Sequence, residues 1–251
     1  MMPDSALHKW ISGDEYVRQI TQLEEDRLAR LAFQNLVLDI APRGGRLFDF
    51  GAGPGLDARF FAERGLGVEA YDVNPKACEY FATYCRDYID SGRIILHRGS
   101  YREFLDRHAT GAGRTDMIVS NFAPLSLVGD LRELFGKFYT LTGPNGKVLA
   151  SVLNPYFVGD MKFPWWWRRV PRLWRDGHYS LPSPEGLVAR RRLAEFAALS
   201  SPYFTLTRVF RGLPESGSQA PRGVDATRAG LRSWFRLATS RFTFLLFDKR
   251  E

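Results

Sequence analysis

Between residues 46 and 154, five apolar runs typical of β-strands alternate with four segments typical of helices. This order limits the folds available to the chain, because alternating strands and helices form a parallel sheet with helices packed against it. The strand-like runs are RLFDF (46–50), GVEAYDV (67–73), RIILHRGS (93–100), TDMIVSNF (115–122) and GKVLASVLN (146–154). The helical segments are DARFFAERG (57–65), NPKACEYFATYCRDYIDSG (74–92), YREFLDRH (101–108) and VGDLRELFGKFYTLT (128–142). We therefore expect an α/β fold.

The segments on either side of this alternating core are less regular. Residues 14–41 carry apolar side chains at helical spacing, and Pro42 with the two glycines after it ends the predicted helix. After Asn154 the alternation breaks, and residues 155–192 are rich in Pro, Trp and Arg without a strand pattern. The remaining expected elements are a helix near 185–199, a strand at 203–212, a loop at 212–224, a short helical stretch and a last strand at 242–248.

Composition places the chain among globular proteins. Its 251 residues suit one large domain, and the hydrophobic (45%) and charged (25%) fractions are ordinary for a soluble protein. No apolar run approaches the roughly 20 residues of a membrane span. The first ten residues lack the apolar region of a secretory signal, and we expect a cytoplasmic protein. The net charge of +7 favours acidic partners, such as nucleic acid, anionic lipid or an anionic small molecule.

The cysteines and histidines predict neither a disulfide nor a metal site. Cys78 and Cys85 lie seven residues apart on a predicted helix. That spacing is roughly 10 Å by helix rise, whereas a disulfide needs Cα atoms within about 7 Å. We expect both to be buried thiols in a reducing compartment. The four histidines are scattered without paired-ligand spacing, so we predict no metal.

The stretch FDFGAGPGLDARFF, residues 48–61, places glycines at positions 51, 53 and 55 directly after a strand-like run. A glycine-rich turn between a strand and a helix can hold a ligand at the helix N-terminus. The Walker pattern of nucleotide triphosphatases requires a Gly-Lys pair, and this stretch contains no lysine. The dinucleotide fingerprint has a third glycine where this chain has Leu56, which argues against a nicotinamide cofactor.

Two acidic residues accompany the glycine turn. Asp49 stands two residues before Gly51, and Asp72 ends the second predicted strand in the run VEAYDVNP. With the Gly-x-Gly-x-Gly turn, they make the chain resemble the class I S-adenosylmethionine-dependent methyltransferases over about residues 45–155. The resemblance implies S-adenosylmethionine as cofactor and a Rossmann-like, doubly wound, mostly parallel seven-stranded sheet with an antiparallel C-terminal strand. It also implies that Asp72 binds the ribose hydroxyls, and that the bare glycine backbone leaves space for the methionine part.

The resemblance further implies a set of cofactor-binding residues at the ends of the first four strands. They are Asp49, Gly51, Ala52, Gly53, Gly55, Asp72, Val73, Ser100, Tyr101, Asn121 and Phe122. The chain departs from the family in RGSYREF, which lacks the acidic residue that often holds the adenine amine, so Ser100 or the Tyr101 backbone would serve. The run SNFAPLS shares only Asn121 with the Asn-Pro-Pro-aromatic motif of enzymes that methylate nucleic-acid amines.

Three polar residues of this set also have purely structural interpretations. Asp49 could cap the turn that follows it, and Asp72 could cap the next helix, a role for which Asn74 competes. Asn121 could be a turn residue that tolerates unusual backbone angles. For each residue, the sequence leaves the structural and the functional interpretation open.

The segment Met161–Ser180 is the most unusual part of the sequence, because four tryptophans and four arginines fall within residues 165–175. In the family this position holds a variable substrate lid. We therefore expect the segment to roof the site, with aromatic rings against an apolar or planar acceptor and arginines against an anionic group. Three alternatives remain open: packing of the tryptophans onto the sheet, an interfacial membrane segment, and stacking on nucleic-acid bases.

We expect a single methyltransferase domain, residues 1–251, made of four parts. They are N-terminal helices (1–44), a cofactor-binding core (45–155), a substrate lid (156–200) and the terminal strands (201–251). The candidate substrate contacts are Tyr16, Tyr156, Trp165 and Arg168. His178 is the candidate general base, whereas His97 is interpreted as a packed histidine within a strand. Two basic groups are expected on solvated faces, the run 190–192 and the stripe at positions 228, 232 and 236.

Methyl transfer requires an acceptor aligned with the methyl group and protected from water, and needs a base only when the acceptor's proton is hard to lose. We predict S-adenosylmethionine-dependent methyl transfer to a small or medium-sized acceptor, with anionic and amphiphilic molecules as candidates. The alternatives are a nucleic-acid (RNA) methyltransferase and a non-catalytic cofactor-binding protein. A small molecule is the expected partner; nucleic acid and a membrane surface are the other partners considered.

Overall fold

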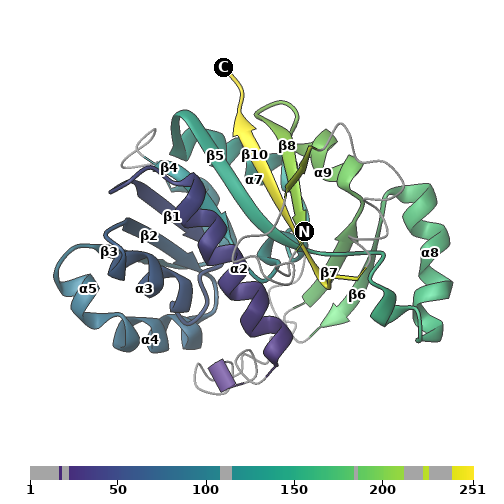
Figure 1. Ribbon diagram of the computed structural model, residues 1–251, viewed down its shortest axis with the longest axis horizontal. Helices are drawn as coiled ribbons and strands as arrows, with labels where there is room; N and C mark the ends of the chain where they lie inside the picture. The colour runs from purple at the N-terminus through teal and green to yellow at the C-terminus, as the bar shows by residue number, and fades with distance from the viewer. Residues whose placement is uncertain (1–16, 19–22, 108–114, 184–185, 212–222, 226–238) are drawn as a thin grey trace.

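A computed structural model describes residues 17–18, 23–107, 115–183, 186–211, 223–225 and 239–251 (Figure 1). A central sheet has the strand order β3-β2-β1-β4-β5-β10-β8-β9. The strands of its parallel part are β1 (Arg46–Phe50), β2 (Gly67–Asp72), β3 (Ile94–Arg98), β4 (Thr115–Ser120) and β5 (Thr142–Leu153). The five strands of the predicted alternating core are therefore all present, and they pair in parallel as expected.

The C-terminal half of the sheet changes strand direction. The strand β10 (Phe242–Lys249) runs antiparallel between β5 and β8 (Phe204–Arg211), and Leu245 lies opposite Ala150 on one side and Val209 on the other. A three-residue strand, β9 (Gly223–Asp225), is added at the edge beyond β8. The mostly parallel Rossmann-like sheet with an antiparallel C-terminal strand is thus confirmed.

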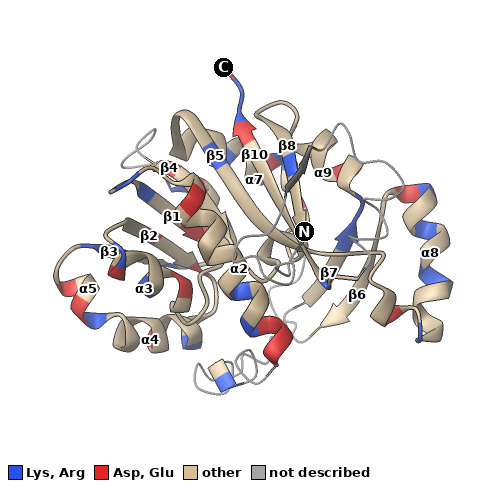
Figure 2. Ribbon diagram, in the orientation of Figure 1, with Lys and Arg blue, Asp and Glu red and all other residues tan. Residues whose placement is uncertain are grey.

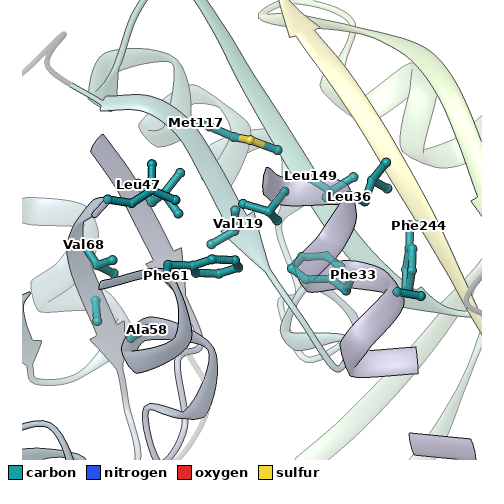
Figure 3. Packing of buried hydrophobic residues seen from close by; sticks show 14 of the residues in the cluster. Phe33, Leu36, Leu47, Ala58, Phe61, Val68, Met117, Val119, Leu149 and Phe244 are labelled. Carbon is teal, nitrogen blue, oxygen red and sulfur yellow. The ribbon is translucent and has the colours of Figure 1, made fainter. Parts of the chain in front are cut away.

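Helices cover both faces of the sheet. One face carries α2 (Glu24–Ile40), α3 (Leu56–Glu63) and α4 (Pro75–Tyr84), and the other carries α6 (Tyr101–Asp106), α7 (Leu131–Leu141) and α9 (Leu193–Ser200). Side chains alternate between the faces along β1, so that Leu47 joins the first core and Phe48 the second. Figure 3 shows the first core, where Phe33 of α2 and Phe61 of α3 are fully buried. Burial of one such ring stabilises the fold by about 1.5–3 kcal/mol.

The helix predicted over residues 74–92 is two helices, α4 and α5 (Arg86–Asp90), which meet at Cys85. The backbone of Cys85 leaves the helical region (φ −104°, ψ 15°), while its side chain stays in the core and its thiol donates to the carbonyl of Gly55 at 3.6 Å. The chain turns there so that α5 leads back to β3. Cys78 and Cys85 are both buried thiols, as expected, and burial raises their pKa values to about 11 and about 12.

The expectation that residues 155–192 contain no strands, and that a helix begins near residue 185, was wrong. This segment contains α8 (Pro164–Asp176) and a hairpin of β6 (His178–Ser183) with β7 (Gly186–Arg191), so the helix expected from residue 185 begins only at Leu193. Its strands carry no clear strand pattern because they contain proline, glycine and arginine. They form because cross-strand pairing and burial of Tyr179 hold them together.

The run 190–192 is not on a solvated face. Arg190 and Arg191 are buried, because each guanidinium finds partners that other segments of the chain supply. Arg190 pairs with the carboxylate of Asp160 and donates to the carbonyl of Asn154 at 3.2 Å. Arg190 therefore attaches the hairpin to the end of β5, whereas Arg191 attaches it to the loop before α7.

Several expectations concern residues outside the described ranges. They are Tyr16, the start of the helix expected over 14–41, most of the loop at 212–224, the helical stretch after it and the basic stripe at 228, 232 and 236. In the described parts of the chain, no helix has both the length and the apolar character needed to cross a bilayer.

Candidate cofactor site

The glycine turn lies between β1 and α3, and its backbone conformation requires glycine. Gly51, Gly53 and Gly55 have φ angles of +75°, +54° and +85°, a region that other residues rarely adopt. The backbone N–H groups of Gly51 and Ala52 donate to the carbonyl of Tyr71 at 2.8 and 3.0 Å, which joins the turn to the end of β2. The turn is therefore held at the carboxyl edge of the sheet.

The space freed at two of these glycines is filled by the protein itself. A Cβ at Gly51 would lie 2.4 Å from the ring of Pro124, and one at Gly55 would lie 2.6 Å from Phe81. Core neighbours thus occupy the room that a side chain would take at both positions, and Gly55 does not line the cavity described below. The backbone at Gly51 and Gly53 does line it, so the expectation that this backbone lies beside the methionine part stays a prediction.

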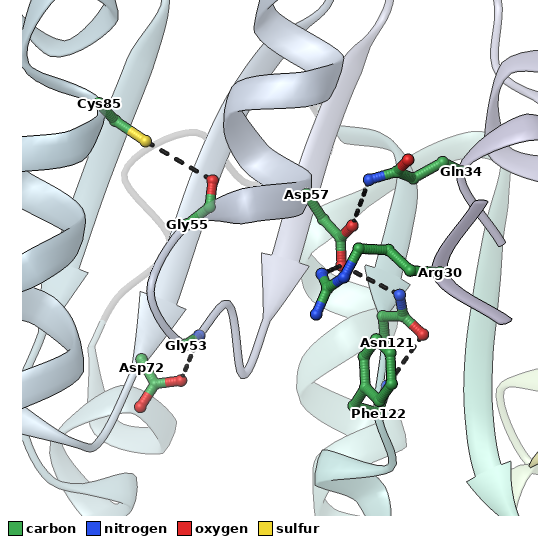
Figure 4. Close-up of polar contacts among 9 residues, drawn as sticks. All are labelled: Arg30, Gln34, Gly53, Gly55, Asp57, Asp72, Cys85, Asn121 and Phe122. Atoms are coloured by element: carbon green, nitrogen blue, oxygen red, sulfur yellow. Dashed lines mark hydrogen bonds and ion pairs between the residues drawn. The ribbon is translucent and has the colours of Figure 1, made fainter. Parts of the chain in front are cut away.

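Asp72 ends β2 with its carboxylate beside the glycine turn. Its Oδ2 accepts from the N–H of Gly53 and its Oδ1 from the N–H of Asn74, both at 2.7 Å (Figure 4 shows the Gly53 contact). Burial raises the pKa of Asp72, against the opposing effect of the backbone hydrogen bonds. Asp72 does not cap α4: Asn74 does, accepting from the N–H groups of Lys76 and Ala77. Backbone N–H groups of Gly53, Asn74 and Val73 thus surround the carboxylate, whose two oxygens offer about four lone-pair sites and so keep capacity to accept from a ligand.

A cavity of about 320 Å³ opens where the carboxyl ends of β1, β2 and β4 meet. Its walls are largely apolar, with Phe50, Val73 and Leu127 among them, and Asp72 and Asn121 supply polar atoms. Such a cavity, mostly apolar with a few polar groups at the end of parallel strands, is where α/β folds bind small molecules.

Seven of the eleven expected cofactor residues line this cavity. They are Gly51, Gly53, Asp72, Val73, Tyr101, Asn121 and Phe122. The other four do not line it. Ala52 packs against the core, Gly55 begins α3, and Ser100 caps α6 by accepting from the N–H of Glu103.

Asp49 is the fourth expected cofactor residue that does not line the cavity. It lies on β1 and is 2% exposed. Its Oδ2 has no hydrogen-bond partner among the residues that the structure describes. Burial raises its pKa well above the usual value, helped by the carboxylates of Asp57 and Asp72 and opposed by Arg30. Asp49 therefore behaves as a buried, weakly acidic group beside the turn.

A polar network that the sequence did not predict supports the wall of the cavity on the β4 side. Asp57 of α3 accepts from Arg30 at 2.6 Å, Gln34 at 2.7 Å and Asn121 at 3.0 Å (Figure 4). The Arg30 guanidinium also lies 4.4 Å from the ring centre of Phe122. The spacing of Arg30 and Gln34, four residues apart on one helix, is the only sequence signal for this network.

The network holds a strained segment of backbone after β4. Phe122 and Ala123 have φ angles of +60° and +65°, which cost about 1–2 kcal/mol per non-glycine residue. The side chain of Asn121 accepts from the N–H of Phe122 at 2.9 Å and donates to Asp57. The unusual backbone angles thus fall on Phe122 and Ala123 and not on Asn121, which holds them through its side chain and lines the cavity; its role in cofactor binding stays a prediction.

Sequence reasoning also missed cavity residues adjacent to predicted ones. They are Phe50, Tyr71, Asn74, Ala77, Pro124, Leu127, Val128 and Gly129. Most are neighbours of motif residues, and position next to the motif was the available signal. Val128 and Gly129 were expected in a helix, but α7 begins only at Leu131, which leaves them in the cavity wall.

The three candidate substrate contacts within the described ranges, Tyr156, Trp165 and Arg168, do not line the cavity. Trp165 and Arg168 line a separate groove of about 280 Å³ with two other arginines, and Tyr156 packs near Trp174. His178 lies 3.1 Å from a carboxylate oxygen of Glu195 and does not line the cavity either. The geometry therefore gives no support to His178 as a general base.

The β6–β7 hairpin contacts the cavity wall from outside. Arg191 of β7, 6% exposed, donates to the carbonyls of Val128 and Gly129 at 3.3 and 3.4 Å. Through these contacts the hairpin supports the loop that closes one side of the cavity.

The fold, with its cavity at the carboxyl edge of the sheet, is Rossmann-like. Residues 16–201 match the family model described as a methyltransferase domain, and the chain belongs to that family. It is an S-adenosylmethionine-dependent enzyme, as the glycine turn and Asp72 predicted. No curated protein sequence matches the chain.

Solved structures share the fold at low sequence identity. A 1,6-didemethyltoxoflavin-N1-methyltransferase from Burkholderia thailandensis, bound to 1,6-didemethyltoxoflavin and S-adenosylhomocysteine, has a TM-score of 0.59 at 17% identity, over 100% of this chain and 93% of that one. A putative methyltransferase from Haloferax volcanii, in complex with the activator Trm112, has a TM-score of 0.61 at 14% identity, over 98% of each chain. A TehB-like methyltransferase from Corynebacterium glutamicum has a TM-score of 0.56 at 15% identity, over 95% and 98%.

Proposed function

We propose that the enzyme binds S-adenosylmethionine in the cavity at the ends of β1, β2 and β4 and methylates a small or medium-sized organic acceptor. The observation that carries the proposal is the carboxylate of Asp72, which is buried at the cavity wall with lone pairs left for a ligand. A carboxylate in this setting suits the two neighbouring hydroxyls of a ribose. The cofactor supplies an electrophilic methyl group on sulfur.

The residues of the cavity fit the different parts of this cofactor. Asp72 would hold the ribose, and the backbone at Gly51 and Gly53 would lie beside the methionine part. Tyr101 and Val73 offer apolar surface for the adenine ring, since both line the same cavity. The volume of about 320 Å³ is near the lower end of the range for small-molecule sites, roughly 300–1,000 Å³. The cofactor would therefore fill most of it.

The acceptor would then approach at the rim. The rim and wall on the β4 side are apolar, with Phe122, Pro124 and Leu127, and Leu127 is itself partly exposed. Such a surface suits an apolar or planar acceptor and excludes water from its face. The chain's own task in the reaction would be to orient the acceptor and exclude water, because alignment is what accelerates an in-line displacement.

We also propose that residues 156–200 act as the wall that shapes the acceptor site. The support is the pair of hydrogen bonds from Arg191 to the carbonyls of Val128 and Gly129. Because these two residues line the cavity, any movement of the hairpin would change the loop that borders it.

Calorimetric titration tests the cofactor site. We expect binding of S-adenosylmethionine and of S-adenosylhomocysteine, and none of nicotinamide dinucleotides. Asp72→Ala should weaken both interactions by about 10- to 100-fold, because hydrogen bonds to a charged group contribute about 1.5–3 kcal/mol. The exposed Asp87→Ala is the matched control. An unchanged affinity in folded Asp72→Ala would remove Asp72 from the site.

A further inference from the structure

The helix α8 has an inner face that attaches it to the rest of the molecule. Trp166 and Leu173 are buried, and the indole N–H of Trp166 donates to the carbonyl of Pro155 at 3.0 Å. Arg169 donates to the carbonyl of Ser180 in β6 at 2.8 Å. These contacts fix the orientation of the helix and leave Trp167, Arg168 and Trp174 among its exposed side chains.

The outer face of α8 carries large aromatic side chains in solvent. Trp167 and Trp174 are 62% and 63% exposed, and Phe163, which precedes the helix, is 42% exposed. These residues are spaced by four and seven positions, so they lie along one side of the helix. Large aromatic side chains gathered in this way mark an interaction surface more often than scattered exposed apolar residues do. We call these three residues the aromatic stripe.

A cationic stripe lies on the same exposed side of the helix. Arg168, Arg172 and Arg175 are exposed and spaced by four and three residues, so they form a second line about a third of a turn around the axis from the aromatic stripe. Arg175 is paired with Asp176 at 2.7 Å, whereas in the described parts of the chain no carboxylate forms an ion pair with Arg168 or Arg172. The thirteen residues of α8 contain four arginines and one carboxylate.

The position of α8 leaves this surface accessible. Figure 1 shows the helix at the outer rim of the molecule, beside the β6–β7 hairpin and at the opposite end from α5. Figure 2 shows the basic residues spaced along it.

We propose that α8 docks this enzyme on an anionic lipid bilayer. Tryptophan is the residue that prefers the boundary between headgroups and acyl chains, and adjacent arginines are attracted to anionic headgroups. The groove of about 280 Å³ between Trp165, Arg168 and Arg172 offers a place for a headgroup phosphate. The inference goes beyond the methyl transfer reaction, because it concerns where the enzyme acts.

Nucleic acid would make different demands on the same residues. Stacking of bases requires open ring faces in a groove that follows the phosphate backbone. Trp167 instead packs edge-to-face on Trp166, with ring centres 4.9 Å apart, and its indole N–H already donates to the carbonyl of Met161 at 2.8 Å. What remains exposed on Trp167 is therefore apolar ring surface, which favours insertion into a bilayer interface.

Sedimentation of the full chain with lipid vesicles tests the proposal. We expect binding to vesicles of phosphatidylcholine with phosphatidylglycerol in equal parts, little binding to phosphatidylcholine alone, and a blue shift of tryptophan emission on binding. Arg168→Glu with Arg172→Glu should weaken binding by at least about tenfold. The control, Arg86→Glu with Arg93→Glu, makes the same change of charge at exposed positions on and after α5 and should bind normally.

A second pair of variants tests the aromatic stripe. Trp167→Ser with Trp174→Ser should weaken vesicle binding by at least about tenfold, since aromatic burial supplies the apolar part of interfacial binding. Ile95→Ser, at an exposed position on β3, should not. Thermal unfolding and titration with S-adenosylhomocysteine would show that the variants remain folded. Equal losses in the α8 variants and their controls, or tighter binding of single-stranded RNA than of vesicles through the same residues, would overturn the proposal.

Discussion

The carboxylate of Asp72 accepts a 2.7 Å hydrogen bond from the backbone N–H of Gly53, nineteen residues earlier in the chain. This contact joins the end of β2 to the turn after β1, and the carbonyl of Tyr71 accepts from the same turn. The geometry of the cavity floor therefore depends on two adjacent parallel strands ending at the same level. One carboxylate both fixes the turn and faces the cavity that the turn borders.

The glycine at position 51 should be indispensable for stability. Gly51→Ala would add a Cβ 2.4 Å from Pro124 at a φ of +75°, and we expect a loss of about 2–4 kcal/mol in the free energy of unfolding. Gly44→Ala is the matched control, because Gly44 has a φ of +68° but nothing within 4 Å of its added Cβ. It should cost only about 1 kcal/mol. Urea unfolding measures both; equal losses would mean that Pro124 moves aside readily.

The buried pair of Arg190 and Asp160 should stabilise the hairpin as a unit. Arg190→Met leaves the largely buried carboxylate of Asp160 without its cation, and we expect a loss of about 3–5 kcal/mol. In the double variant with Asp160→Asn, part of this loss should be recovered, because no uncompensated charge remains. A double-mutant cycle by urea unfolding measures the coupling. Additive effects would show that the pair contributes nothing beyond its separate contacts.

Replacement of the buried carboxyl of Asp49 by a neutral amide should stabilise the ligand-free protein at neutral pH. Its folded pKa is raised by burial, so the folded state holds a proton that the unfolded state has already released. Stability is therefore unaffected below the unfolded pKa, near 3.8, and falls as the pH rises from there toward the folded pKa.

Asp49→Asn removes this penalty, since the asparagine side chain is neutral at every pH. The variant should unfold at higher urea than the native protein at pH 7.5 and at nearly the same urea at pH 3.5. The exposed Asp39→Asn, the control, should change stability by less than about 0.5 kcal/mol at either pH. A variant that is less stable at pH 7.5 would show that the charged form of Asp49 is favoured in the fold.

The two cysteines should be unreactive until the protein unfolds. Burial raises the pKa values of Cys78 and Cys85 to about 11 and about 12, so at pH 8 only about one thiol in a thousand or fewer is ionised. Mass spectrometry after iodoacetamide treatment should find almost no modification of the folded protein and full modification in urea. Fast labelling of either thiol in the folded state would contradict its burial.

The sequence was informative where local patterns carry the signal. The five strands at 46–154, the glycine turn and Asp72 could be predicted, because period, backbone conformation and a motif of fixed spacing are properties of short segments. It failed at the β6–β7 hairpin, which contains Pro182 and Gly186 and forms through pairing with its partner strand. It also treated Arg190 and Arg191 as solvated, since charged residues are usually exposed.

The sequence by itself thus determined the order of strands and helices along the chain, the class of enzyme, and the residues in and beside the glycine turn. Only the tertiary structure decided which distant groups meet: Arg30, Gln34 and Asn121 around Asp57, and Asp160 beside Arg190. It also decided that the room at Gly51 and Gly55 belongs to Pro124 and Phe81. The physical reason is that burial of a polar group, or close approach of a ring, is favourable only with a particular partner. No local pattern records which distant segment will supply it.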